Sequence, residues 1–260
     1  MHDPIISTFV LIRKSNPARR QGHNVPLRLQ SLMFFDAIRR RLVPDGRDRL
    51  PRRLVQLFVG LLLYGFSDGL LVLAGLGLDP WDVFHQGLSR HSSLPIGTWV
   101  IIVGAGVMLL WIPLRQWPGL GTLCNVIVIG LVINATIMLI PAPAALPLRV
   151  LTLVAAVVLN GIATGAYIGA GLGPGPRDGL MTGLARRGHS IRVVRTSIEL
   201  TVLATGFLLG GTVGIGTVLY AASIGPLAHI FIPLLAVNRR GGPHSLPGDP
   251  IRPHPSVLPD

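Results

Sequence analysis

The chain has 260 residues, of which 50% are hydrophobic and only 13% are charged, and its mean hydropathy is +0.59. Soluble domains carry roughly 25% charged residues, so this composition excludes an ordinary soluble domain and indicates an integral membrane protein. The net charge of +12 comes almost entirely from arginine. Because basic residues in membrane proteins mark the cytoplasmic side, we expect the lipid bilayer rather than nucleic acid as the partner.

Residues 1–50 form a basic region that precedes the first long apolar segment. The stretch LQSLMFFDAIRRRL, residues 29–42, predicts an amphipathic helix whose arginines suit the anionic lipid of the cytoplasmic leaflet. The alternative is that Met33, rather than Met1, is the true start, which would remove most of this region. At the other end, residues 238–260 are rich in proline and predict a disordered cytoplasmic tail.

Six apolar segments lie between these ends, and each is long enough to cross the ~30 Å hydrocarbon core as a helix. They cover residues 54–76, 97–114, 119–141, 150–172, 193–211 and 213–237. With both termini in the cytoplasm, only Arg90 and Arg149 of the 23 Lys and Arg residues lie on the outer side. The positive-inside rule therefore predicts that both termini are cytoplasmic.

The six segments form two related groups of three. Residues 65–88 align without a gap with residues 161–184, and ten of the 24 pairs are identical. An odd number of spans in the first group turns the second group upside down, as in the inverted repeats of many secondary transporters. The sequence thus predicts an all-α integral membrane protein with six transmembrane helices in two inverted three-helix repeats, residues 51–145 and 146–237.

Each repeat has a glycine-proline motif after its first span, reading GLGLDPWDVFHQGL at 75–88 and GLGPGPRDGLMTGL at 171–184. Pro80 and Pro176 predict the first residue of a short helix, because proline lacks the N–H group that would be unpaired at that position. The glycines that the two copies share where the span ends are Gly75, Gly77, Gly171 and Gly173.

The aspartates of this motif have two interpretations. Asp82 and Asp178 lie in the first turn of the predicted short helices, close to the positive end of the helix dipole, while Asp79 is a plausible N-cap and Gly175 a weaker one. The first interpretation is helix capping. The second is that the helix end holds an anionic substrate group, or that Asp82 or Asp178 binds a proton or cation.

Two ionisable residues lie inside predicted spans, where a charge is expensive and is a candidate for a substrate or ion pathway. Asp68 lies in the first span, and its alternative role is a hydrogen bond to Ser67 or to a neighbouring backbone group. Glu199 lies in the fifth span, four residues after Arg195, so the two side chains can form an ion pair on one helix face.

Further polar residues complete the candidate site. Asn134 and His229 occupy matching positions in the two repeats, which would allow them to line one central cavity, although hydrogen bonding between helices is the alternative for Asn134. His85 and His189 flank the spans, and we expect both in water. We find no metal-ligand spacing, phosphate loop or catalytic constellation, so the expectation is a protein without enzyme activity, cofactor or metal.

The motifs resemble those of the YczE/YyaS/YitT-type bacterial membrane proteins, and most closely the YczE-like branch. The resemblance covers about residues 54–236 and rests on GLGLDPWDVFHQGL, GLGPGPRDGLMTGL, RTSIEL and GGTVGIGT. In the second half, Arg177, Arg195 and Glu199 follow in the expected order. This resemblance implies a polytopic protein of the bacterial plasma membrane, and it does not supply a substrate.

The inverted repeat with intramembrane carboxylates favours a small secondary transporter or exporter of a small molecule. The alternative is a non-transport scaffold or regulatory membrane protein that recruits a partner, or anionic lipid, through residues 1–50. The two functions differ in whether removal of the basic region abolishes the activity.

Overall fold

The computed structural model describes residues 49–237, and within this part every regular element is a helix. Residues 1–48 and 238–260 lie outside the described residues, and the predicted amphipathic helix at 29–42 and the predicted tail lie outside with them. The described helices are α3 (Leu50–Ala74), α4 (Pro80–Arg90), α5 (Ile96–Leu109), α6 (Trp111–Leu114), α7 (Leu120–Leu139), α8 (Leu146–Gly169), α9 (Pro176–Ala185), α10 (Ile191–Leu208) and α11 (Ile215–Leu235).

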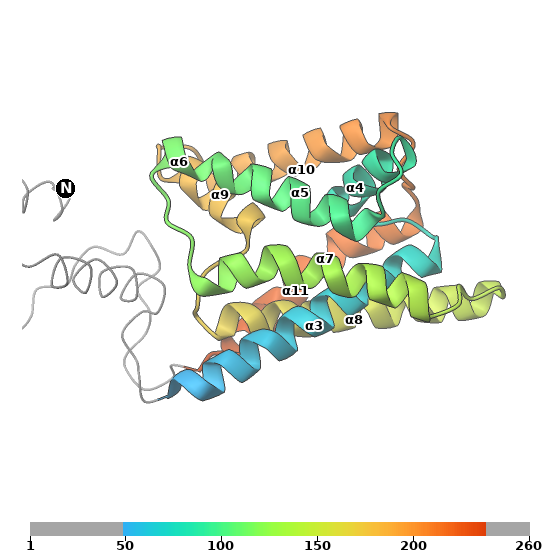
Figure 1. The fold of residues 1–260 in the computed structure, drawn as a ribbon, viewed down its shortest axis with the longest axis horizontal. Coiled ribbons are helices and arrows are strands. Elements are labelled where there is room, and N and C mark those ends of the chain that lie inside the picture. The colour runs from blue at the N-terminus through green and yellow to red at the C-terminus, as the bar shows by residue number, and fades with distance from the viewer. Residues whose placement is uncertain (1–48, 238–260) are drawn as a thin grey trace, which may run out of the picture. The chain divides into compact units, whose positions relative to one another are not determined.

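These helices form two packed groups (Figure 1). The long helices α3, α7, α8 and α11 lie together in the lower part of the view, with α3 packed against both α7 and α8, and α8 against α11. The upper part contains α4, α5, α6, α9 and α10, in which α4 and α9 each contact both α5 and α10. The contact between α5 and α7 connects the two groups.

Five of the six predicted spans coincide with helices that are long and apolar enough to cross a membrane: α3, α5 continued by α6, α7, α8 and α11. The helix α10 covers the sixth predicted segment, but its 18 residues include three charged ones, Arg192, Arg195 and Glu199. The prediction of a helical membrane protein with several apolar helices is therefore confirmed for the described residues.

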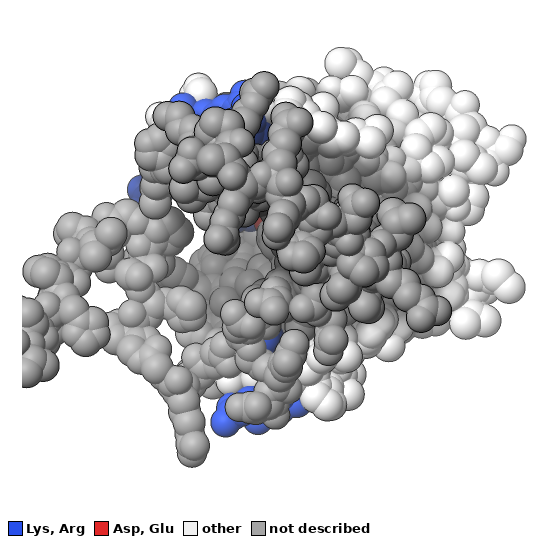
Figure 2. Space-filling model, turned by 60° about the vertical axis from the view of Figure 1, so that its left-hand side comes forward, with Lys and Arg blue, Asp and Glu red and all other residues white. Residues whose placement is uncertain are grey.

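Large apolar side chains cover much of the outer surface. Leu62, Leu131 and Val218 have 50%, 56% and 68% of their surface exposed. Soluble monomers rarely expose apolar patches of more than a few hundred Å², whereas such a surface is favourable against lipid. In Figure 2, the Lys and Arg atoms that are visible lie toward the left, and the right-hand part of this face shows neither basic nor acidic residues.

The glycine-proline motifs end one helix and begin the next as the sequence predicts. Gly75 ends α3 with φ of 61°, and Gly171 has φ of 64° directly after α8. This left-handed conformation is readily adopted only by glycine. Pro80 and Pro176 are the first residues of α4 and α9, so both predicted short helices are present.

Two arginines bind the helix ends of the opposite half of the chain. Arg53 on α3 and Arg149 on α8 each donate through Nε and Nη2 to two successive carbonyl oxygens, with distances of 2.7 Å for Arg53 and 2.8 Å for Arg149. The acceptors are Ala170 and Gly171 for Arg53, and Ala74 and Gly75 for Arg149. These positive groups at helix C-termini are favourable, because the last carbonyls carry partial negative charge.

Glycines in the long helices allow close contacts between helices. A Cβ atom at Gly65 would lie 2.7 Å from the carbonyl oxygen of Ile129 on α7, and a Cβ atom at Gly161 would lie 2.6 Å from Cβ of Leu227 on α11. The absence of a side chain lets α3 approach α7, and α8 approach α11, in the same way.

Each motif loop also packs against a helix start in the other half of the chain. The N–H of Gly216 on α11 donates to the carbonyl oxygen of Leu76, and the N–H of Gly121 on α7 donates to that of Leu172, both at 2.8 Å. The loop after α3 is therefore held by α11, and the loop after α8 is held by α7.

Candidate functional site

A cavity of about 280 Å³ lies where the N-terminal ends of α4 and α9 come together. The two helices extend away from it, with α9 toward the left and α4 toward the right of the upper group in Figure 1. Both motifs contribute to its lining, through Asp79, Pro80, Trp81, Gly175, Pro176, Arg177 and Asp178. Two segments separated by almost 100 residues thus form one site.

Arg177 links the two helix ends across the cavity. Its Nη1 lies 3.6 Å from Oδ2 of Asp79, and its guanidinium carbon lies 5.6 Å from the centre of the Trp81 ring. The positive-inside prediction counts Arg177 and Arg195 among the basic residues on the cytoplasmic side. In the structure Arg177 is in the first turn of α9, Arg195 is in α10, and both line the cavity.

All three tyrosines of the chain line this cavity, each from a different long helix: Tyr64 on α3, Tyr167 on α8 and Tyr220 on α11. The rings of Tyr64 and Tyr167 meet edge to face, with 5.8 Å between their centres. The hydroxyl of Tyr167 donates to Oδ2 of Asp178 at 2.7 Å, so the carboxylate of Asp178 has a partner inside the cavity.

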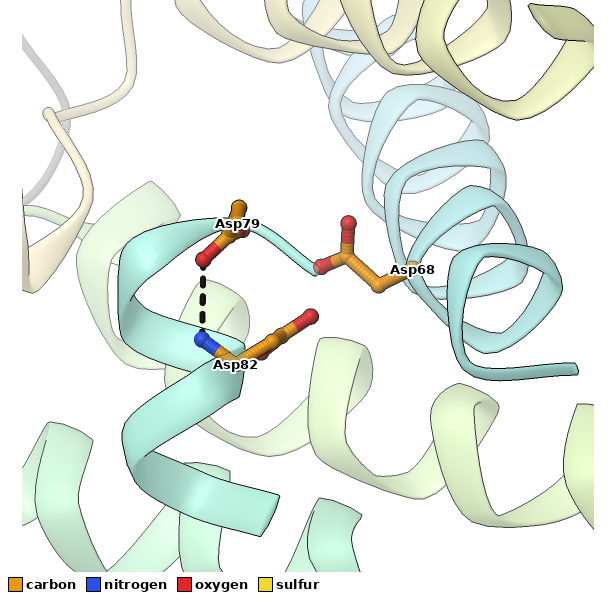
Figure 3. A group of neighbouring side chains, drawn as sticks. All are labelled: Asp68, Asp79 and Asp82. Atoms are coloured by element: carbon orange, nitrogen blue, oxygen red, sulfur yellow. Dashed lines mark hydrogen bonds between the residues drawn. The ribbon is translucent and has the colours of Figure 1, made fainter. Parts of the chain in front are cut away.

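Three carboxylates gather beside the cavity: Asp68 from α3, Asp79 from the loop and Asp82 from α4 (Figure 3). Of the three, Asp79 lines the cavity, whereas Asp68 and Asp82 are not among its lining residues. The three residues are 0%, 1% and 1% exposed, and each contributes an oxygen to a set whose members all lie within 4.8 Å of one another. Figure 3 shows the side chains of Asp68 and Asp82 extending toward each other from opposite sides.

The cluster begins with the local structure of α4. Asp79 caps this helix, as predicted, because its Oδ1 accepts the backbone N–H of Asp82 at 2.8 Å. The cap places Asp82 in the first turn, directly beside Asp79. Asp79 lies in the connection between α3 and α4, where burial and the neighbouring carboxylate of Asp82 raise its pKa to about 6, despite Arg177.

A hydrogen-bond network holds the third carboxylate. Asn160 on α8 donates through Nδ2 to Oδ1 of Asp68 at 2.7 Å and to the hydroxyl of Ser67 at 2.9 Å. The hydroxyl of Tyr220 donates to Oδ1 of Asn160 at 3.0 Å. The donor to Asp68 is thus Asn160, rather than Ser67 as we considered from the sequence, and the network joins α3, α8 and α11.

Comparison with known proteins identifies the family. Residues 51–233 match the model of a family of unknown function (DUF6198). The chain belongs to this family. It is 45% identical over 181 residues to an uncharacterized protein of Haemophilus influenzae, which covers 69% of this chain and 83% of the relative.

Two relatives from Bacillus subtilis confirm the resemblance seen in the motifs. The uncharacterized membrane protein YczE is 36% identical over 179 residues, covering 68% of this chain and 83% of YczE. The uncharacterized protein YyaS is 27% identical over 195 residues, covering 70% and 96% of the two chains. No solved structure matches the chain. This DUF6198 member is therefore a membrane protein with YczE-like relatives.

In this DUF6198 member, the site includes a histidine that we expected in water. His85 is 2% exposed, and its Nδ1 lies 3.1 Å from Oδ1 of Asp82. The expectation of a solvated His85 was wrong because the three-residue spacing on α4 turns its ring toward Asp82 and into the protein. His189, in contrast, is exposed as expected.

Of the remaining predicted residues, one lines the cavity, one joins two helices and one is exposed. Glu199 lines the cavity, and its Oε1 accepts a hydrogen bond from Nε of Arg195 at 2.9 Å, which confirms the predicted pair. Asn134 accepts the N–H of Gly97 at 2.8 Å and so connects α7 with α5. His229 is exposed, and neither Asn134 nor His229 is among the residues that line the cavity.

Proposed function

We propose that this protein is a small secondary transporter of the bacterial plasma membrane, with the central cavity as its substrate site. The observation that carries the proposal is the meeting of two short-helix N-termini at one polar cavity between apolar helices. Many secondary transporters bind substrate at the interface of two repeats, where the N-terminal ends of interrupted helices point at anionic groups of the substrate. The proposal includes no covalent step and no cofactor.

Paired contacts support two halves of inverted topology. Three kinds of contact occur twice, at equivalent positions of the two halves. They are the carbonyl contacts of Arg53 and Arg149, the glycine contacts of α3 and α8, and the docking of each motif loop on a helix start. We propose α10 as the sixth span, because its 18 residues extend about 27 Å at 1.5 Å per residue, close to the ~30 Å hydrocarbon core. Arg195 and Glu199, two of its charged residues, line the cavity.

The orientation of the transporter follows from the arginines at the helix ends. Arg52 lies in the first turn of α3, and Arg186 and Arg187 directly follow α9. Arg187 donates to the carbonyl oxygen of Pro113 in α6, so the ends of α6 and α9 lie together. We propose that this side faces the cytoplasm and that the side of Arg90 and Arg149 faces outward, in agreement with the positive-inside rule.

The dimensions and charges of the cavity favour a small amphoteric cargo. Its volume of about 280 Å³ is just below the ~300–1,000 Å³ of typical ligand pockets. Its lining offers the guanidinium groups of Arg177 and Arg195 together with the carboxylates of Asp79, Asp178 and Glu199. A molecule carrying both an anionic and a cationic group can interact with both kinds of side chain without leaving one buried charge unpaired.

The experiment begins with purified protein and a panel of small amino and carboxylic acids. A compound that raises the melting temperature is then tested for uptake into proteoliposomes. We expect Arg177→Gln to reduce uptake at least tenfold, because this side chain joins the two helix ends at the cavity. The matched control is Arg192→Gln, which removes an exposed arginine that does not line the cavity.

Two results decide the roles of individual residues. If Arg177→Gln and Arg192→Gln reduce uptake equally, the cavity is not the substrate site. Unchanged uptake by Glu199→Gln would remove Glu199 from the transport mechanism but leave the cavity in place.

A further inference from the structure

The three buried carboxylates beside the cavity are also a candidate cation site. We infer that Asp68, Asp79 and Asp82 bind one hard cation, such as Na⁺ or Ca²⁺, beside the proposed substrate site. The inference rests on the proposed function only for the role of this ion in coupling. The binding site itself follows from the geometry and can be tested without any transport.

The first observation is that one oxygen of each carboxylate has a polar contact and the other has no hydrogen bond. Oδ1 of Asp68 accepts from Asn160, Oδ1 of Asp79 accepts from the backbone of Asp82, and Oδ1 of Asp82 lies beside His85. The three Oδ2 atoms are buried and have no hydrogen-bond partner. A buried polar atom without a partner costs about 1–3 kcal/mol, and more when it is charged, so these three atoms favour the binding of a ligand.

The second observation is an excess of negative charge in a buried place. The nearest guanidinium belongs to Arg177, whose Nη1 lies 3.6 Å from Oδ2 of Asp79. His85 contacts Asp82 and adds at most one further positive charge. Three carboxylates therefore face one permanent positive charge, and an uncompensated charge in a low-dielectric site is strongly unfavourable. A bound cation removes this excess.

The chemistry of the donors selects the class of ion. Carboxylate oxygens without sulfur donors are typical ligands of hard cations. Two oxygens on opposite sides of an ion with metal–oxygen distances of 2.3–2.6 Å are separated by roughly 5 Å. The cluster oxygens all lie within 4.8 Å of one another, so they are close enough to coordinate one ion.

The surroundings also have features of a binding site for ions. Asn160 and His85 orient two of the carboxylates, as outer-shell partners commonly do around metal ligands. Asp79 belongs to both the cluster and the cavity lining, so the cation site adjoins the cavity. A residue shared by two sites allows binding at one to affect binding at the other, which coupling requires.

The test measures cation binding to the purified full-length chain in detergent, in choline chloride at pH 8. NaCl, CaCl₂ and MgCl₂ are added in turn, and melting temperature and heat of binding are recorded. At a hundredfold excess over the Kd, we expect one of these ions to raise the melting temperature by roughly 5–10 °C.

Isosteric variants locate the site. Asp68→Asn keeps an oxygen that can accept from Asn160, so the network is retained while one charged ligand is lost, and we expect cation affinity to fall at least tenfold. Asp82→Asn should act in the same way. The matched control is Asp178→Asn, which changes the aspartate at the equivalent position of the second motif, whose Oδ2 is already bonded to Tyr167, and should leave the cation effect unchanged.

The outcomes separate this inference from the proposed function. If none of the three ions changes the melting temperature or releases heat, the inference is overturned, even if transport is observed. Stabilisation only by lowering the pH would also overturn it, by assigning protons to the cluster. Cation binding that disappears in Asp68→Asn, without uptake of any cargo, would support the site and contradict the transporter.

Discussion

Replacement of Arg53 by lysine tests the paired arginine contacts most simply. Arg53 is 5% exposed and donates two hydrogen bonds of 2.7 Å to the end of α8. A hydrogen bond from a charged group contributes ~1.5–3 kcal/mol, and lysine keeps the charge but cannot reproduce the fork of two parallel donors. With one of the two bonds lost, we expect a destabilisation of about 2 kcal/mol, or roughly 4–8 °C in melting temperature.

The assay is thermal unfolding of purified protein in detergent, compared with two further variants. Arg149→Lys removes the equivalent fork, but Arg149 is only half-buried, so solvent screening should make its effect smaller. Arg52→Lys is the matched control, because Arg52 is exposed and adjacent in sequence. Equal melting temperatures for Arg53→Lys and Arg52→Lys would refute the assignment of a structural role to this contact.

Three further predictions concern packing, the Arg195–Glu199 pair and the basic region. Gly179→Ala should destabilise the protein by ~1–3 kcal/mol, because its Cβ would lie 1.9 Å from the Trp111 ring, whereas Gly106→Ala, with no atom within 4 Å, should not lower the melting temperature. Glu199→Gln should change stability by no more than ~0.5 kcal/mol, since this side chain is 32% exposed, so a melting temperature lowered by more than 2–3 °C would contradict a weak Arg195–Glu199 pair. Removal of residues 1–48 should leave proteoliposome uptake intact, and loss of activity in this truncation would instead favour the scaffold.

Helix positions were largely predictable because local chemistry fixes them. Pro80 and Pro176 begin α4 and α9, and Asp79 caps α4, as proline and aspartate at these positions predict. The length of the apolar segments was sufficient to predict the positions of the long helices. The helix α10 is ambiguous because its charged residues lower its mean hydropathy below that of a typical membrane span. In the structure, two of these residues, Arg195 and Glu199, line the cavity.

The candidate site was less predictable, because its residues meet only through tertiary packing. Asp68 lies 11 residues before Asp79, and no short-range pattern indicates that the two carboxylates approach each other. Asn160 and Tyr220 are isolated polar residues in apolar helices, and only the contacts among α3, α8 and α11 join them to Asp68. One signal was available in the sequence: all three tyrosines lie inside apolar segments, and all three line the cavity.

The central claim is that two inverted halves enclose the cavity, so that the connections after α4 and α9 lie on opposite sides of the membrane. Arg90 at the end of α4 binds Gly210 just beyond α10, whereas α9 leads into the start of α10. The direct measurement is labelling of single cysteines by an impermeant maleimide in intact cells, after Cys124→Ser removes the one native cysteine. The account predicts that Ser93→Cys, in the exposed connection after α4, reacts from outside, and that Ser190→Cys, after α9, reacts only when the membrane is permeabilised. Labelling of both cysteines from the same side would contradict it.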